Sequence, residues 1–225
     1  YFEVRNRSKI EVLARLLAQE GDLDGAVRLL VEAAQTAQDR AASASEGASP
    51  TRQRELAAST EREVVFLANQ RGALLEEAGE LDEAIAAFRE VLALRPSDPE
   101  AMNSLGYVLA DHDLDLAEAQ SLLEAAAQQR AFSGAVADSV GWLRFRQGRL
   151  DEAREAVERA SLWSPGSPEI LLHLGEIESK AGRKAAARRA YEAALAATKH
   201  APTASSRHRL VIEARLRVLG ASGRR

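Results

Sequence analysis

The sequence is short of several residue types that define common protein classes. It has no cysteine, a single methionine and only 4% aromatic residues in 225 positions. Without cysteine the chain can form no disulfide, no thiolate zinc site and no cysteine nucleophile. No stretch alternates apolar and polar residues while being rich in β-branched and aromatic types, so strand signals are weak. No apolar run approaches the roughly 20 residues that span a bilayer.

What the chain has instead is alanine and leucine, which supply most of its 46% hydrophobic content. Both residues favour helices, and small side chains let helices pack closely, so we expect an all-α protein. Arginine dominates the basic residues and alanine is the commonest residue, a bias that indicates a bacterial origin. The first residue is Tyr1 rather than methionine, so we expect that an upstream segment, with any export signal, is missing.

A phrase of the type Gly-x-Leu-Asp-x-Ala recurs along the chain. Its copies occupy residues 21–26, 79–84 and 148–153, residues 182–187 keep only the first Gly and the last Ala, and a looser copy stands at 113–119. From residue 84 onward the final alanines are spaced by 35, 34 and 34 residues. That spacing is the period of a helix-turn-helix solenoid. Between the first two copies the spacing is 58, which leaves 24 extra residues.

The pattern around this period resembles the tetratricopeptide repeat family. A small residue stands at repeat position 8, namely Ala14, Gly72, Gly106, Gly141 and Gly175. A bulky residue stands at position 24 in most copies, namely Leu30, Phe88, Leu123, Val157 and Tyr191, and proline at position 32, namely Pro96 and Pro165. The resemblance implies an all-α, right-handed α-solenoid of about five stacked repeats with a C-terminal capping helix. It departs from the family at position 11, where Arg144 and Glu178 replace a bulky residue.

The expected organisation has four parts. They are a first repeat over residues 1–40, a loop and helix-extension insert over 41–59, four repeats over 60–203, and a capping helix with a basic tail over 204–225. Residues 41–50 mix small and polar residues without apolar periodicity and are expected to form a loop, followed by one overlong helix over 51–79. The capping helix is expected to pack through apolar residues at helical spacing, namely Leu210, Val211, Ala214, Val218 and Leu219.

The resemblance also implies a binding groove. In the family, the first helix of each repeat (helix A) lines a concave face through positions 2, 5, 9 and 12. The matching residues here are Asn69, Glu100, Asn103, Tyr107, Asp138, Trp142, Glu169 and Glu176. They predict an acidic groove with an aromatic centre, in which asparagine pairs with a peptide backbone. Alternatively, Tyr107 and Trp142 are core residues that pack between adjacent A helices.

The expected function is a non-catalytic scaffold that binds a protein or peptide partner on the concave face of the superhelix. The alternative is a recruiting or regulatory arm of a larger enzyme whose catalytic domain lies outside this chain. From Lys180 to the end there are 12 basic and two acidic residues, while the rest is acidic. This asymmetry would allow self-association. Nucleic acid is not expected as a partner, because no recognition motif accompanies the basic end.

No catalytic residue, metal site or cofactor is expected. The run Asp111, His112, Asp113 and Asp115 could bind a cation, but it lies in an inter-helix turn where aspartate is favoured as a cap. His173 and Glu176 lack the second histidine of a zinc-protease motif. The Leu-Gly-Tyr and Val-Gly-Trp openings of two A helices resemble those of envelope-associated bacterial repeat proteins. We therefore expect the periplasm or envelope, with the cytoplasm as the open alternative.

Overall fold

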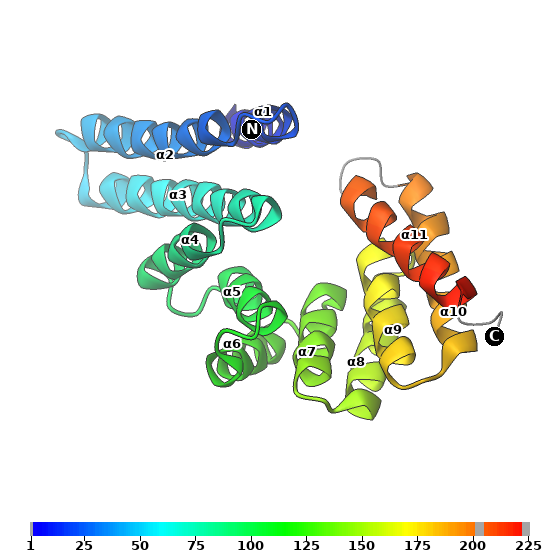
Figure 1. The fold of residues 1–225 in the computed structure, drawn as a ribbon. Coiled ribbons are helices and arrows are strands. Elements are labelled where there is room, and N and C mark those ends of the chain that lie inside the picture. The colour runs from blue at the N-terminus through cyan, green and yellow to red at the C-terminus, as the bar shows by residue number, and fades with distance from the viewer. Residues whose placement is uncertain (1, 201–204, 222–225) are drawn as a thin grey trace. The chain divides into compact units, whose positions relative to one another are not determined.

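The computed structural model describes residues 2–200 and 205–221, which contain eleven α-helices and no strand (Figure 1). The helices are α1 (Phe2–Gln19), α2 (Leu23–Ser45), α3 (Pro50–Ala78), α4 (Leu81–Leu94), α5 (Pro99–Asp111), α6 (Leu116–Gln129), α7 (Gly134–Arg146), α8 (Leu150–Trp163), α9 (Pro168–Lys180), α10 (Lys184–Ala197) and α11 (Ser205–Ala221). A 3₁₀ turn covers Thr198–His200. The expected all-α solenoid is confirmed. Within the described ranges, no helix is long and apolar enough to cross a membrane.

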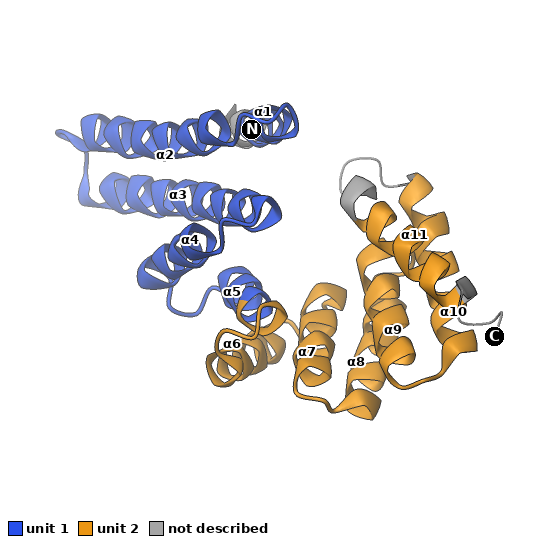
Figure 2. Ribbon diagram, in the orientation of Figure 1, with its two compact units in different colours: residues 1–108 blue, residues 109–225 orange. Residues whose placement is uncertain are grey.

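The chain divides into two compact units within α5. Unit 1 comprises residues 1–108 and unit 2 comprises residues 109–225 (Figure 2). Each unit consists of helices that pack against their neighbours in the sequence. Local packing of this kind is what a repeat array requires, since each helix pair must cover the apolar face of the next.

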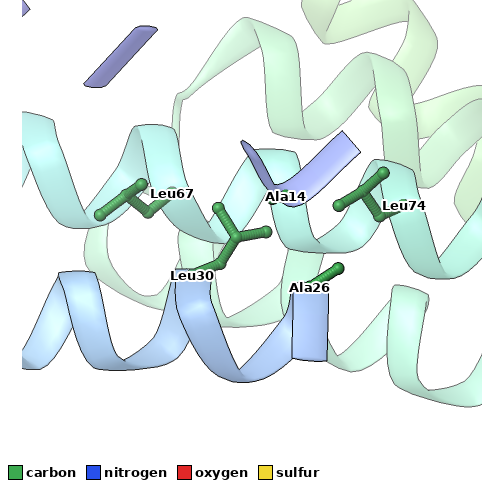
Figure 3. Close-up of a cluster of buried hydrophobic side chains, with 5 residues drawn as sticks. All are labelled: Ala14, Ala26, Leu30, Leu67 and Leu74. Carbon is green, nitrogen blue, oxygen red and sulfur yellow. The ribbon is translucent and has the colours of Figure 1, made fainter. Parts of the chain in front are cut away.

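In unit 1, α2 packs against both α1 and α3, and α3 against α4. The apolar residues of α2 recur at helical spacing, so Ala26 and Leu30 are fully buried on one face. Figure 3 shows Leu30 directed toward α3, where Leu67 and Leu74 complete the cluster with Ala14 of α1. A second cluster joins α3, α4 and α5 through Val65, Ala68, Val91 and Ala101.

The loop predicted over residues 41–50 is wrong in its first half, because α2 continues to Ser45 and only residues 46–49 are non-helical. Alanine is the best helix former and fills much of this stretch, while Gly47, at a φ of 71°, lies in the turn. The extra residues lengthen both helices. α2 has 23 residues against 14 in α4, and α3 has 29 against 13 in α5. The expected overlong helix is confirmed as α3.

In unit 2, α7 pairs with α8 and α9 with α10. The core between these helices contains mostly alanine with larger residues at intervals, among them Val157, Ile177 and Tyr191, all fully buried. Leu143 and Ile177, each one residue before the polar position 11, are also buried. A shift of one residue therefore lets these A helices keep an apolar contact despite Arg144 and Glu178.

The expected capping helix is present as α11, which packs against α10 and α9. Its predicted apolar face is wrong in part. Ile212 is completely buried, whereas Leu210 and Val218 are 70% and 62% exposed. At about 100° per residue, Leu210 lies roughly 160° and Val218 roughly 120° from Ile212 around the helix axis, so neither shares its buried face. Residues 201–204, where the last predicted repeat meets the predicted capping helix, and residues 222–225 of the predicted basic tail lie outside the described residues.

Side-chain caps fix where several A helices begin. Asp98 Oδ1 accepts a hydrogen bond from Ala101 N at 3.0 Å at the start of α5. Ser167 Oγ accepts one from Ile170 N at 3.4 Å at the start of α9. These caps satisfy free amides in the first turn and set the register of the polar residues that follow.

Candidate functional site

The eight predicted groove residues lie on the four A helices α3, α5, α7 and α9. Three of them, Asn69, Asp138 and Trp142, are 4% to 7% exposed. Asn103, Tyr107 and Glu176 are half-buried, whereas Glu100 and Glu169 are exposed. Tyr107 belongs to unit 1 and Trp142 to unit 2, so their predicted proximity stays a prediction. A partner-binding role for the eight residues likewise stays a prediction.

Three of these residues share an unusual feature. Asn69, Asn103 and Asp138 occupy repeat position 5 of α3, α5 and α7, and each has a buried Oδ1 atom without a hydrogen-bond partner. Leaving a buried polar atom unpaired costs roughly 1–3 kcal/mol. The same repeat position therefore carries an unpaired buried oxygen in α3, α5 and α7.

Trp142 lies in the packed arrangement rather than at an open surface. Its ring stacks on Phe145, with centroids 4.7 Å apart, and on His173, with centroids 4.1 Å apart. Its Nε1 donates a hydrogen bond to Asp111 Oδ1 at 2.8 Å. The indole therefore stacks on two rings and is held at its polar edge, and it forms one wall of a buried polar cluster.

The centre of that cluster is His173 of α9, which is 5% exposed. Its Nδ1 lies 2.8 Å from Oδ2 of Asp138 on α7. Burial by itself would lower the pKa of His173. The charge and hydrogen bond of Asp138, with the charges of Glu169 and Asp111, outweigh burial and raise that pKa above its usual value.

A third group completes the arrangement. Glu169 precedes His173 by one helical turn on α9, and one potential metal-ligating atom from each of Asp138, Glu169 and His173 lies within 4.8 Å of the others. Glu169 is the least buried of the three. Sequence reasoning placed Asp138 and Glu169 in the groove but missed His173 as their neighbour. The available signal was its spacing of 35 residues from Asp138, which is one residue more than the repeat step of 34.

The remaining acidic candidates of unit 2 have ordinary structural partners. Asp115 caps α6 by accepting hydrogen bonds from Ala117 N and Glu118 N, as its position in the turn predicts. Asp113 pairs with Arg146. Glu176 Oε1 lies 2.6 Å from Nε of Arg215, which ties α11 to α9. Glu176 therefore holds the capping helix in addition to its predicted place in the groove.

Comparisons with known proteins agree with this architecture. A family profile described as "Tetratricopeptide repeat" matches residues 144–206, and one described as "TPR repeat" matches residues 72–113. The chain therefore contains tetratricopeptide repeats. A TPR repeat-containing protein of Pseudomonas aeruginosa is 35% identical over 106 residues, which cover 47% of this repeat protein and 18% of the relative. A bacterial origin fits this relative.

Cellulose synthase operon protein C of Xanthomonas axonopodis is 34% identical over 143 residues, covering 57% of this tetratricopeptide repeat chain and 9% of that protein. The chain therefore spans less than a fifth of the length of the curated relatives it matches.

Solved structures show the same fold. A thermophilic TPR protein of Thermus thermophilus has a TM-score of 0.63 at 17% identity, covering 95% of this tetratricopeptide repeat chain and 98% of that one. PilW, a type IV pilus biogenesis factor, has a TM-score of 0.61 at 15% identity, with 94% and 92% covered. At these identities the likeness concerns the fold alone.

Proposed function

We propose that this chain is a non-catalytic scaffold that binds a peptide or protein segment on the face formed by its A helices. The tetratricopeptide repeat fold itself indicates a protein-protein interaction scaffold. The finer proposal concerns where the partner lies and which side chains it contacts.

The observation that carries the proposal is the unpaired amide oxygen of both Asn69 and Asn103 in unit 1. An asparagine amide can accept from an N–H group and donate to a carbonyl, which matches the two polar groups of an extended main chain. A partner segment that placed an N–H group beside either oxygen would remove a desolvation cost already present in the free chain. Glu100, one turn before Asn103 on α5, adds an exposed negative charge.

Selection of binding peptides, followed by a comparison of their affinities for a double variant and a control variant, tests this proposal. A library of random peptides displayed on phage is selected against the 225-residue chain, and the affinity of each selected peptide is measured by fluorescence anisotropy. We expect the affinity of the double variant Asn69→Ala/Asn103→Ala to be lower by a factor of about ten or more. The reason is that two hydrogen bonds between uncharged groups are lost, at roughly 1 kcal/mol each. Gln38→Ala removes an exposed amide from α2 of the same unit and should leave the affinity unchanged.

The two possible results are distinguishable. Because the two amide oxygens have no partner, the double variant should keep the helical content and thermal stability of the parent chain. Failure to select any peptide, or equal affinity of the folded double variant and the parent, would refute the proposed groove.

A second candidate is that this scaffold is the recruiting or regulatory arm of a larger enzyme. That the chain is part of a larger protein is favoured by the coverage of the two bacterial relatives, since the chain matches only 18% and 9% of their lengths. An antibody raised against the chain tests it on an immunoblot of the source cells. A single band near 24.3 kDa, the mass of this chain, would contradict the larger protein.

Self-association between the acidic body and the basic C-terminal end is part of the same proposal. Light scattering tests it, because an electrostatic contact should give a larger mass at low than at high ionic strength. A monomeric mass at both would rule it out.

A further inference from the structure

We propose that Asp138, Glu169 and His173 of unit 2 form a binding site for a divalent transition-metal ion, with Zn²⁺ as the best fit. The inference goes beyond partner binding, and it concerns the A helices α7 and α9 within one compact unit.

The first support is geometric. Glu169 and His173 are four residues apart on α9, so both side chains lie on one face of that helix. Asp138 reaches the same point from α7, and one potential ligand atom of each residue lies within 4.8 Å of the others. In tetrahedral zinc sites, metal-ligand distances of about 2.0–2.2 Å place ligand atoms roughly 3.3 Å apart. Rotation of the Glu169 side chain, the least buried of the three, can bring its carboxylate within coordination distance of the ion.

The second support is an atom that packing leaves unexplained. Asp138 is 4% exposed, its Oδ2 lies beside His173, and its Oδ1 is buried without a hydrogen-bond partner. Both oxygens belong to one carboxyl group, so the unpaired atom lies at the cluster. A buried carboxylate oxygen that lacks a donor is expected where a cation completes the site.

The third support is the charge balance. The carboxylates of Asp138, Glu169 and Asp111 all act electrostatically on one imidazole. Three carboxyl groups around one imidazole leave an excess of negative charge at the cluster, which a divalent cation would neutralise.

The ligand types select the class of metal. An imidazole nitrogen suits zinc, copper, iron and nickel, whereas magnesium and calcium prefer sites made entirely of oxygen. One nitrogen and two carboxylates leave the fourth tetrahedral position open, as in zinc sites that bind a water molecule or an external group.

Calorimetric titration of the metal-stripped 225-residue chain with Zn²⁺ tests the site. We expect one ion per chain, and no comparable heat with Mg²⁺ or Ca²⁺. Glu169→Gln leaves the Asp138–His173 pair in place and should weaken Zn²⁺ binding at least about tenfold, as should His173→Gln. Co²⁺ serves as a spectroscopic probe, and its visible absorption should report coordination in the parent chain and be lost in both variants.

Two controls separate this site from adventitious surface binding. Glu192→Gln removes an exposed carboxylate from α10, and His112→Gln removes the histidine beside Asp111. Both should bind Zn²⁺ like the parent chain. Far-UV circular dichroism checks that all variants remain folded. No uptake of Zn²⁺, equal uptake by folded Glu169→Gln and His173→Gln, or equal affinity for Mg²⁺ would overturn the proposal. No peptide enters the titration, so its failure would leave the proposed partner binding untouched.

Discussion

Replacing Gly175 by alanine tests how closely α9 and α10 approach. A Cβ atom at this position would lie 2.4 Å from both Cδ1 and Cε1 of Tyr191 and 3.0 Å from Cζ. The ring is completely buried and belongs to a cluster formed with Leu172, Ala187, Ala194 and Ile212. It therefore cannot move aside without disturbing the contact between α10 and α11.

The expected size of the effect follows from two opposing contributions. Forcing an extra methyl group into a packed core costs typically about 1–3 kcal/mol. The higher helix propensity of alanine offsets about 1 kcal/mol of that cost. Because the overlap involves two carbons of a ring with no free space, we place the cost at the upper end of its range. The net prediction is a loss of about 1–2 kcal/mol in the free energy of unfolding of unit 2.

The two tryptophans of the sequence provide a selective assay. Both Trp142 and Trp163 belong to unit 2, so tryptophan fluorescence during urea unfolding reports that unit alone. With a urea dependence of about 1–3 kcal/mol per molar for small proteins, the midpoint should fall by roughly 0.5–1 M. A double-mutant cycle with Tyr191→Leu isolates the overlap, since Gly175→Ala should cost less once the ring is gone.

An unchanged or higher urea midpoint for Gly175→Ala would refute this reasoning. The same conclusion would follow if the substitution cost as much beside Leu as beside Tyr at position 191. Either result would mean that the backbone approach of α9 and α10 does not depend on the missing Cβ atom.

Three further predictions concern the rest of unit 2. Ile212→Ala should lower the stability measured by tryptophan fluorescence by about 2–4 kcal/mol, since this side chain of α11 is completely buried against α9 and α10. Glu176→Gln should speed hydrogen exchange of the α11 amides by breaking the 2.6 Å pair with Arg215, and the difference from the parent should shrink at about 1 M salt, where charge pairs are screened. Trp142→Phe should cost about 1 kcal/mol in urea unfolding followed by the remaining tryptophan, because Asp111 Oδ1 loses its 2.8 Å donor.

The repeat register could be predicted because its determinants are close in the sequence. A glycine at position 8 faces the bulky residue at position 24 of the same repeat. The distance from an added Cβ to the nearest such side-chain atom is 2.6 Å for Gly72 and Phe88, 2.5 Å for Gly141 and Val157, and 2.4 Å for Gly175 and Tyr191. Each pair lies within one helical hairpin, so a single copy of the repeat contains both partners.

The sequence alone could not predict which face of α11 is buried. Leu210, Ala214 and Val218 recur at helical spacing, and so do Ile212, Leu216 and Leu219. Both stripes satisfy an amphipathic pattern, and only contact with α9 and α10 selects the second. Contacts between side chains of different repeats are likewise not visible in the pattern of a single repeat. The sequence spacing associates His173 with Glu176 on its own helix, whereas the structure pairs His173 with Asp138 of the preceding repeat.

Repeat position 5 has an apolar residue in one A helix and a polar residue in three others. In α9 this position is Leu172, which is 7% exposed and packs in the core with Tyr191. An apolar side chain therefore suits the position, yet α3, α5 and α7 have Asn69, Asn103 and Asp138 there, each with an unpaired buried oxygen. Packing alone would favour leucine in place of Asn69 and Asn103, because each unpaired oxygen costs roughly 1–3 kcal/mol. Asp138 differs, because its Oδ2 is paired with His173. If Asn69 and Asn103 serve a ligand, their substitution by apolar residues should keep or raise stability while it removes binding, and a loss of both together would contradict that interpretation.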